Sequence, residues 1–513
     1  MIEIVYNYAP VVILLLALLF FVSPIPFGKQ ETLSKAPVFI GFGLHFILFF
    51  TYSFTTSFFG VSDMSGANVA RLYLEGFPLY GSPQTNGYSH SLLYGPLCFI
   101  PTVFSFKIFG FSIFSAKLWS ITQYAFLLLG LLFLYRKYND EKDVLFRNTL
   151  ISLILSLCFF IPPEFYLITL SCLYAFYYPF KSPLWRAAFI GINAGIAGNL
   201  RLHGLLYVLP SFFKWKIDRT KLIVYLFVTC LFLLFTAVLP FFLPNVSFQE
   251  YFQLLKNGGK HGFPADIIIL QLMWLICLLL SALPLGCILR SEKDKTLSYF
   301  GALASLISVI LIFLISCKAG SGPHHLLSAF PILLFVLSVY KVPSKFNMKR
   351  LAICFVLSYS LIGSLRALKN EYDLIRFPSF LVISDINDFL RNTNVSVAIG
   401  FGSVKYSPWW KPSGLGRTME LGFLFPNDLG LGGVASLMDF QQSGCNLSKT
   451  INDRLLNSKI DFILIPKDFR PFYIENWYTK RTLLDSSLSE QFLERYYLYS
   501  RSKYFDIYSK QNK

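Results

Sequence analysis

The chain has 513 residues, of which 55% are hydrophobic and only 14% are charged, and its formal net charge is +17. Soluble domains carry about a quarter charged residues, so this composition excludes an ordinary soluble protein. In a membrane protein, positive charge is expected in cytoplasmic loops and beside anionic headgroups, so we do not expect nucleic acid as a partner.

Apolar runs long enough to cross a bilayer recur along the first 368 residues. A crossing helix needs about 17–25 mainly apolar residues, which predicts an all-α polytopic membrane domain over residues 1–368 with about 11–13 crossings. The N-terminal run lacks a basic leader and a cleavage site, so we expect a retained helix rather than a signal peptide. The expected crossings are 9–27, 37–58, one or more within 91–135, 147–162, 165–180, 183–213, 221–243, 264–290, 295–316, 324–340 and 349–368.

Basic residues in the loops predict the orientation of these crossings. The loops expected in the cytoplasm are 28–36, 214–221, 290–295 and 341–350. The loops expected outside are 59–90, 244–263, 317–323 and everything after 369.

Two topologies remain open between residues 91 and 215. If 91–112 and 115–135 both cross, the basic cluster Arg136–Arg147 lies outside. If one of them is re-entrant, the cluster lies inside and 183–213 crosses twice, with a break near Gly198–Arg201. Within that region Gly191, Gly195 and Gly198 form a stripe of small residues, which favours close helix packing over a binding role.

The first large external loop, 59–90, contains a short run that is compatible with a helix. Ser62 or Asp63 could serve as its N-cap, and Gly76 is placed to end it before Pro78. Small and apolar residues share one face of this run, so we expect a helix that lies along the membrane surface. Those residues are Ala67, Ala70 and Leu74, together with Arg71.

Three short motifs follow this run in a fixed order: Gly76-Phe77-Pro78-Leu79-Tyr80, then Tyr94-Gly95-Pro96, then Phe109-Gly110-Phe111-Ser112. That order resembles the first external loop of GT-C glycosyltransferases, which include protein O-mannosyltransferases and the lipid A aminoarabinose transferase. The resemblance covers roughly residues 40–340. It implies transfer of a sugar from a polyprenyl-phosphate carrier to a hydroxyl of a lipid, glycan or protein on the extracytoplasmic face, with inversion of the anomeric centre.

The resemblance assigns Asp63 as the general base that takes the proton of the acceptor hydroxyl. A second interpretation, that Asp63 only caps the surface helix, stays open. Glu164 is the best candidate for a second catalytic acid if its turn faces outward, and otherwise it is a solvated turn residue. With one firm acid we predict neither a metal nor another cofactor.

A lipid-phosphate leaving group needs cations at the outer membrane face. The loop from Lys318 to His324 and His325 is the sharpest candidate, and an ordinary helix-entry turn with a snorkelling lysine is the alternative. Tyr80 and Tyr94 are candidates for lining a sugar pocket. The remaining candidate ligands of the substrate are Arg71, Arg201, His203, Lys260 and His261.

After residue 368 the composition becomes mixed and polar, which predicts a small extracytoplasmic α/β domain over 369–513. We expect strands at Val395–Phe401, Ile460–Ile465 and Tyr504–Tyr508, and helices at Ser384–Arg391 and Lys449–Asn457. The sequence contains no phosphate loop or nucleophile elbow in this region.

The chief rival function is a carrier or flippase for lipid-linked sugars, which needs the same basic pocket but no catalytic base. Charged residues deep within helices are scarce, which disfavours ion-coupled transport. An O-antigen polymerase or ligase is a further rival, but those enzymes place their key basic residues in a late loop. The absence of a retention signal favours the bacterial inner membrane as the location.

Overall fold

Most of the transmembrane region and part of the C-terminal region are described in the computed structural model of this chain. The described residues are 8–23, 30–56, 58, 61–80, 93–137, 144–178, 180–214, 219–258, 261–290, 298–339, 347–376, 382, 384–387, 397–400, 402–403, 424, 437–438, 441, 460–476 and 481–511.

Contacts divide the chain into two compact units. Unit 1 contains residues 1–51, 120–239 and 263–373, and unit 2 contains residues 52–119, 240–262 and 374–513. The domain boundary near Lys369 that the composition suggests stays a prediction.

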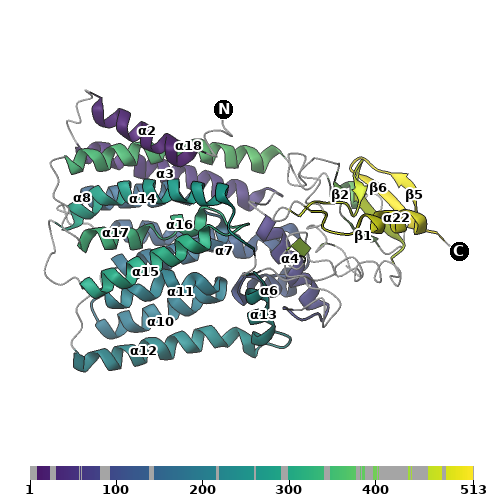
Figure 1. Cartoon of the computed structure of the whole chain (residues 1–513), viewed down its shortest axis with the longest axis horizontal. Coiled ribbons are helices and arrows are strands. Elements are labelled where there is room, and N and C mark those ends of the chain that lie inside the picture. Colours follow the sequence, from purple (N-terminus) through teal and green to yellow (C-terminus); the bar gives the residue numbers. More distant parts are fainter. Residues whose placement is uncertain are drawn as a thin grey trace. The chain divides into compact units, whose positions relative to one another are not determined.

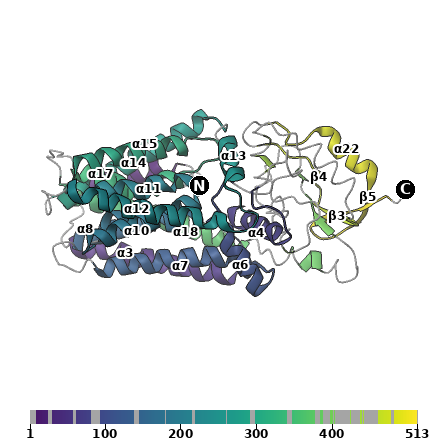
Figure 2. The same cartoon turned by 90° about the horizontal axis from the view of Figure 1, so that it is seen from below.

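Helices that run alongside one another make up unit 1 (Figure 1, Figure 2). Those lying wholly or mainly in this unit are α2 (Ala9–Val22), α3 (Gln30–Phe54), α7 (Ile113–Lys137), α8 (Val144–Cys158), η3 (Pro163–Phe165), α9 (Tyr166–Tyr177), α10 (Pro183–Leu200), η4 (Leu202–Gly204), α11 (Leu205–Val208), η5 (Leu209–Phe213), α12 (Arg219–Val238), α14 (Ala265–Arg290), α15 (Tyr299–Ser316), α16 (His324–Leu327), α17 (Phe330–Val339) and α18 (Met348–Arg376).

Among the described residues, six helices are long and apolar enough to cross a membrane. They are Lys35–Phe54, Ile113–Lys137, Lys221–Phe242, Ala265–Leu289, Tyr299–Ser316 and Met348–Ile375. The side chains of Ile223 and Phe227 on the third of these are 75% and 66% exposed, which is stable only against a nonpolar solvent. The chain is therefore a helical membrane protein, and the total of about 11–13 crossings stays a prediction.

The residues that flank the four basic loops of unit 1 lie at one end of its helices. Arg350 at the start of α18 donates a hydrogen bond to the carbonyl of Ser23, just after α2. The Ser298 N–H donates to the carbonyl of Lys214 at 3.0 Å. Gly286 near the end of α14 packs on Leu337 near the end of α17. One shared end is what a common cytoplasmic side requires, and the side itself stays a prediction from charge.

A helix break at Arg201 turns the chain back alongside α10. Helix α10 ends at Leu200, and Arg201 is extended with φ −150° and ψ 130°. The returning segment η4–α11–η5 then packs along α10, because Arg186 near the start of α10 donates to the carbonyl of Ser211 at 2.7 Å. The break lies at the position that the second of the two open topologies needs.

The segment before α7 also favours that second topology. Helix α6 (Ile100–Phe109) has 10 residues, so it is about 15 Å long and too short to cross a bilayer core of about 30 Å. We therefore prefer the arrangement in which 183–213 forms a hairpin and the basic end of α7 lies at the same end as the other basic loops.

Glycines allow α10 and α12 to pack backbone against backbone. A Cβ built on Gly191 would lie 2.4 Å from the carbonyl oxygen of Thr229, and one on Gly195 would lie 1.8 Å from the Thr236 hydroxyl oxygen. Neither position has room for a side chain. The interpretation of this stripe as a packing surface is confirmed.

Replacing Gly191 with alanine is expected to destabilise the protein by about 1–3 kcal/mol, because the methyl group meets backbone that cannot move aside cheaply. Thermal unfolding in detergent measures the effect. Gly43→Ala on α3 is the matched control, since nothing lies within 4 Å of its built Cβ. Equal melting temperatures for the two variants would contradict the packing argument.

Unit 2 contains short helices and the strands of the C-terminal region. The helices are η1 (Pro96–Cys98), α4 (Val61–Leu74), α6, η6 (Leu239–Phe242), α13 (Phe248–Gly258) and α22 (Ser486–Arg495). Helix α4 ends as predicted: Gly76 has φ +95°, its N–H donates to the carbonyl of Tyr73, and the Phe77 N–H donates to the carbonyl of Leu72. These two bonds form a Schellman motif, for which glycine is favoured at the left-handed position.

The start and the burial of α4 differ from the expectation. The helix begins at Val61, so Ser62 and Asp63 lie inside its first turn rather than at its N-cap. Ala67, Val69 and Leu72 point in different directions around the helix and are all buried. Helix α4 is thus packed into the core of unit 2, including against α6, instead of presenting a single buried stripe.

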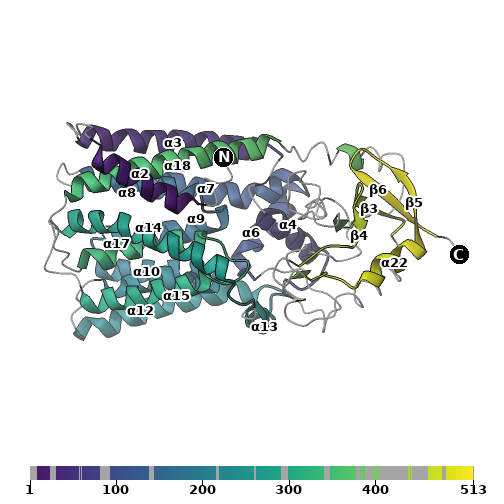
Figure 3. The same cartoon turned by 45° about the horizontal axis from the view of Figure 1, so that its top comes forward.

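A four-stranded sheet of order β1-β3-β6-β5 forms the described part of the C-terminal region. Its strands are β1 (Val397–Ile399), β3 (Phe462–Pro466), β5 (Tyr496–Arg501) and β6 (Phe505–Lys510), and a second, two-stranded sheet pairs β2 (Gly402–Ser403) with β4 (Arg470–Pro471). Strands β1 and β3 are parallel, and the other pairs of the main sheet are antiparallel. Figure 3 shows α22 leading into β5.

The three predicted strands are confirmed as β1, β3 and β6. Strand β5 and helix α22 were not predicted from the sequence. Of the two predicted helices, residues 384–387 are helical, whereas Lys449–Asn457 lies outside the described residues.

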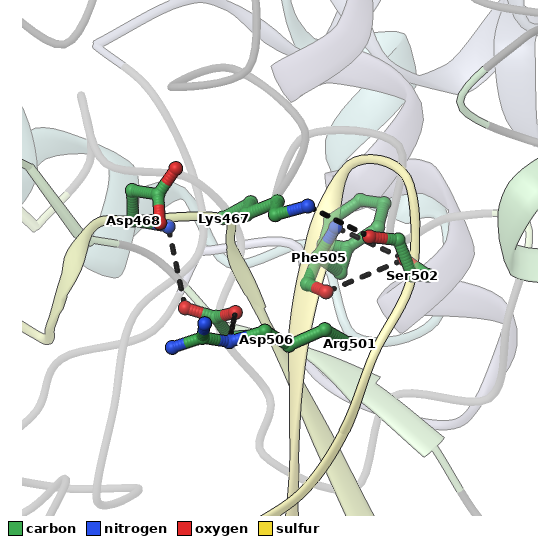
Figure 4. Close-up of polar contacts among 6 residues, drawn as sticks. All are labelled: Lys467, Asp468, Arg501, Ser502, Phe505 and Asp506. Carbon is green, nitrogen blue, oxygen red and sulfur yellow. Dashed lines mark hydrogen bonds and ion pairs between the residues drawn. The ribbon is translucent and has the colours of Figure 1, made fainter.

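An ion pair and several hydrogen bonds stabilise the turn between β5 and β6 (Figure 4). Arg501 Nε lies 3.1 Å from the buried Asp506 carboxylate, which also accepts the backbone N–H of Asp468 at 3.2 Å. The Ser502 N–H donates to the carbonyl of Phe505 at 2.9 Å. Both carboxylate oxygens of Asp506 thus have a partner, so we interpret these contacts as stabilising the turn.

Candidate functional site

Three separate loops of unit 1 bring a group of polar side chains together. One loop is the turn between α8 and α9, the second is the break after α10, and the third follows α15. The side chains are Glu164, Arg201, His203, Lys318, His324 and His325, which we name the polar cluster. All six were predicted as site residues from the sequence, although Glu164 and His325 lie 161 positions apart along the chain.

Arg201 and Glu164 form a buried ion pair in this cluster. Arg201 Nη2 lies 3.5 Å from Glu164 Oε1, and the two side chains are 10% and 12% exposed. The Arg201 guanidinium also lies 4.7 Å from the centre of the Phe165 ring, within range of a cation–π contact. The extended backbone of Arg201 at the helix break positions it for both contacts.

Two histidines from different loops form a hydrogen bond. His325 Nδ1 lies 2.9 Å from His203 Nε2. One nitrogen must donate and the other must accept, and an accepting ring nitrogen carries no proton. At least one imidazole of the pair is therefore neutral in this arrangement.

Aromatic rings and one hydroxyl fix the positions of the histidines. The Tyr207 hydroxyl donates to the carbonyl of His325 at 2.6 Å. The Phe165 ring meets His324 and His325 edge to face, with ring centres 4.7 and 4.9 Å away. Phe165 thus lies under Arg201 and beside two imidazoles, which makes it the centre of the cluster.

Lys318 begins the turn that leads into α16. The Ser321 N–H donates to the carbonyl of Lys318 at 3.0 Å, and Gly320 has φ +78°, which glycine tolerates best. The positive charges of Arg201 and Lys318 both disfavour a further positive charge on His203. Because Glu164 offsets Arg201, the half-buried Lys318 leaves the cluster with a net positive charge, which suits an anion.

Helix directions place this cluster at the end of unit 1 opposite the basic loops. Arg201 follows the last turn of α10, whereas Arg186 in its first turn contacts Ser211, shortly before the basic-loop residue Lys214. Lys318 follows α15, whose first residue comes just after Ser298, the partner of Lys214. The loop of Glu164 therefore lies at the same end as the loop of Lys318, as its predicted role requires.

The remaining predicted site residues belong to unit 2. Asp63 lies in the first turn of α4, where a carboxylate is favoured by the helix dipole. Arg71 pairs with Glu75 at 2.6 Å, and its guanidinium lies 3.6 Å from the centre of the Phe111 ring. Lys260 lies outside the described residues, and the neighbouring His261 is buried.

The two tyrosines predicted to line a sugar pocket contact each other. Tyr80 is fully buried, and its hydroxyl donates to the carbonyl of Tyr94 at 2.8 Å. Its ring lies 4.8 Å from that of Tyr251, and Tyr94 is stacked on Phe99. These contacts give both residues a packing role within unit 2, and a sugar contact stays a prediction.

Phe165 and Tyr207 were missed by the sequence analysis. Phe165 directly follows Glu164 in Pro162-Pro163-Glu164-Phe165, and a large ring beside a candidate acid was the available signal. Tyr207 lies four residues after His203, one helical turn on, but the chain contains 29 tyrosines and nothing distinguishes this one.

Within the part of the chain that the structure describes, no three His, Cys, Asp or Glu side chains are placed to hold a metal ion. The prediction that no metal is used stays a prediction.

The chain matches no protein-family model, no curated protein and no solved structure.

Proposed function

We propose that this chain is a membrane glycosyltransferase that moves a sugar from a polyprenyl-phosphate carrier to an acceptor hydroxyl. The observation that supports the proposal most is the polar cluster, which gathers Arg201, Lys318 and three histidines at one end of a membrane-embedded helical unit. The order of motifs after residue 59, which resembles GT-C enzymes, is the second support.

In the proposed reaction the acceptor oxygen attacks the anomeric carbon of the donor sugar. The bond between that carbon and the phosphate oxygen breaks, and the oxygen leaves with the bonding electron pair. Arg201 and Lys318 would stabilise the charge on the departing phosphate, because a site with reduced dielectric strengthens such contacts. The assignment of Asp63 as the base that takes the proton of the acceptor hydroxyl rests on the resemblance to GT-C enzymes alone.

The carrier or flippase function is the main competitor, because a lipid-phosphate site would serve both. The decisive measurement uses purified protein in lipid nanodiscs with a panel of polyprenyl-phosphate sugars, and follows release of polyprenyl phosphate by mass spectrometry. Release that depends on an acceptor supports the transferase. Binding of the lipid without any cleavage over the whole panel would move the assignment to a carrier.

Replacing Lys318 with glutamine is expected to weaken polyprenyl-phosphate binding by about tenfold or more, since a charge-assisted contact is worth about 1.5–3 kcal/mol. Lys221→Gln is the matched control, because Lys221 is an exposed lysine near the start of α12. Helix α12 runs in the same direction as α10, so Lys221 lies at the end of unit 1 opposite the polar cluster. Equal affinities for the two variants would remove Lys318 from the binding site.

A further inference from the structure

The Arg201–Glu164 pair is looser than a strong charge-assisted hydrogen bond. Its 3.5 Å separation exceeds the about 2.7–2.9 Å typical of such bonds, although both side chains are largely buried. The guanidinium is also in reach of the Phe165 ring and acts electrostatically on His324 and His325. Arg201 is therefore held by a carboxylate while it lies over the ring that also contacts His324 and His325.

A phosphate group would compete with Glu164 for this guanidinium. Carboxylate and phosphate oxygens both accept hydrogen bonds from the planar guanidinium fork, and phosphate is an equally good partner in geometry. A phosphate beside Glu164 would also place two negative groups close together in a site with little water, which is unfavourable unless they separate.

We propose that Glu164 is an internal competitor for the substrate phosphate, so that binding of the lipid phosphate transfers Arg201 from Glu164 to the substrate. This inference rests on the proposed function. The exchange separates the Glu164 carboxylate from Arg201 only while the donor phosphate is bound. Before that, the pair keeps the arginine and the carboxylate from being buried as separate charges.

The alternative is an ion pair that only stabilises the fold. The two interpretations predict different effects of neutralising Glu164 on the affinity for phosphate. If the pair only supports the fold, removing the charge of Glu164 takes one partner from a buried arginine and brings no gain in affinity. If Glu164 competes with the ligand, removing its charge frees Arg201 and strengthens phosphate binding.

The experiment measures the dissociation constant of a polyprenyl monophosphate for wild type, Glu164→Gln, Arg201→Lys and the double variant in nanodiscs. Glu164→Gln is expected to tighten binding about tenfold, which corresponds to about 1.4 kcal/mol. Arg201→Lys is expected to weaken binding, because lysine cannot form the planar fork. In the double variant the gain from Glu164→Gln should largely disappear.

Two controls separate this exchange from other effects. Asp266→Asn removes an exposed carboxylate at the start of α14 and is expected to leave the affinity unchanged. Glu164→Asp keeps the negative charge but moves it away from Arg201, so it should tighten binding less than Glu164→Gln does. If Glu164→Gln does not fold, Glu164→Asp takes its place in the test.

The possible failures are distinguishable. Wild type that binds the lipid with no gain in either Glu164 variant overturns the exchange and leaves the proposed function standing. A full gain that persists in the double variant shows that Glu164 acts through its general field and also overturns the exchange. Wild type that does not bind polyprenyl phosphate overturns the proposed function, and the exchange with it.

Discussion

The Asp63→Asn substitution is expected to lower the rate of sugar transfer by about 10²–10⁴-fold and to leave the affinity for polyprenyl phosphate nearly unchanged. The amide cannot take a proton from the acceptor hydroxyl, so a reaction that depends on a general base slows. The substitution is well suited to the question because asparagine matches aspartate in size, so the change is limited to the charge and to its modest helix-dipole contribution in the first turn of α4. Single-turnover rates with excess enzyme, measured beside lipid binding, separate the two properties.

The control for Asp63→Asn is again Asp266→Asn, which removes an exposed carboxylate from the first turn of another helix, α14. Its transfer rate should equal that of wild type. Unchanged transfer by Asp63→Asn would exclude Asp63 as the base and return it to a role at the start of α4. Loss of lipid binding and transfer together would indicate a folding or binding role instead.

The Gly204→Val substitution is expected to destabilise unit 1 by about 3 kcal/mol or more and to prevent recovery of monodisperse protein. A Cβ built on Gly204 would lie 2.1 Å from the carbonyl oxygen of Ala197 in α10. Backbone is on both sides of this contact, so nothing can rotate out of the way. Size-exclusion chromatography after detergent extraction, together with thermal unfolding, measures the effect.

Gly198→Ala tests whether that effect depends on the backbone contact. Its built Cβ would lie 3.1 Å from a side-chain carbon of Leu205, which can shift by a few tenths of an ångström. We expect a small change in melting temperature for Gly198→Ala and a large one for Gly204→Val, although both lie in the same hairpin. Similar losses would show that the hairpin is sensitive to any added volume.

The long apolar helices and the end of α4 were predictable because their signals are local. Length and composition indicate a span, and Gly76 before Pro78 indicates a stop, whatever surrounds them. The break at Arg201 belonged to only one of the two topologies that the sequence left open, since Gly198 is equally compatible with a role in helix packing. The short length of α6 and the contact of Arg186 with Ser211 favour the hairpin alternative, and both depend on the folded chain.

The members of the polar cluster were predictable one by one, but their pairing was not. Each histidine or basic residue near a helix end is a candidate by chemistry alone. Nothing in the sequence states that His203 reaches His325 or that Glu164 reaches Arg201, because those contacts depend on how α9, α10 and α15 pack. Strand β5 was missed for a related reason: as an edge strand it exposes Tyr497, Leu498 and Tyr499 in succession, so it lacks the alternation that marks a half-buried strand.

The hairpin of α10 and the segment that returns beside it also constrains how the protein is made. The returning segment, Leu202–Phe213, is broken into three short helical pieces and contains Pro210, so alone it would leave backbone polar groups without partners in lipid. Its close contact at Gly204 exists only when α10 is already beside it. We therefore expect the two segments to enter the bilayer together during synthesis, because the returning segment is paired only when α10 lies beside it.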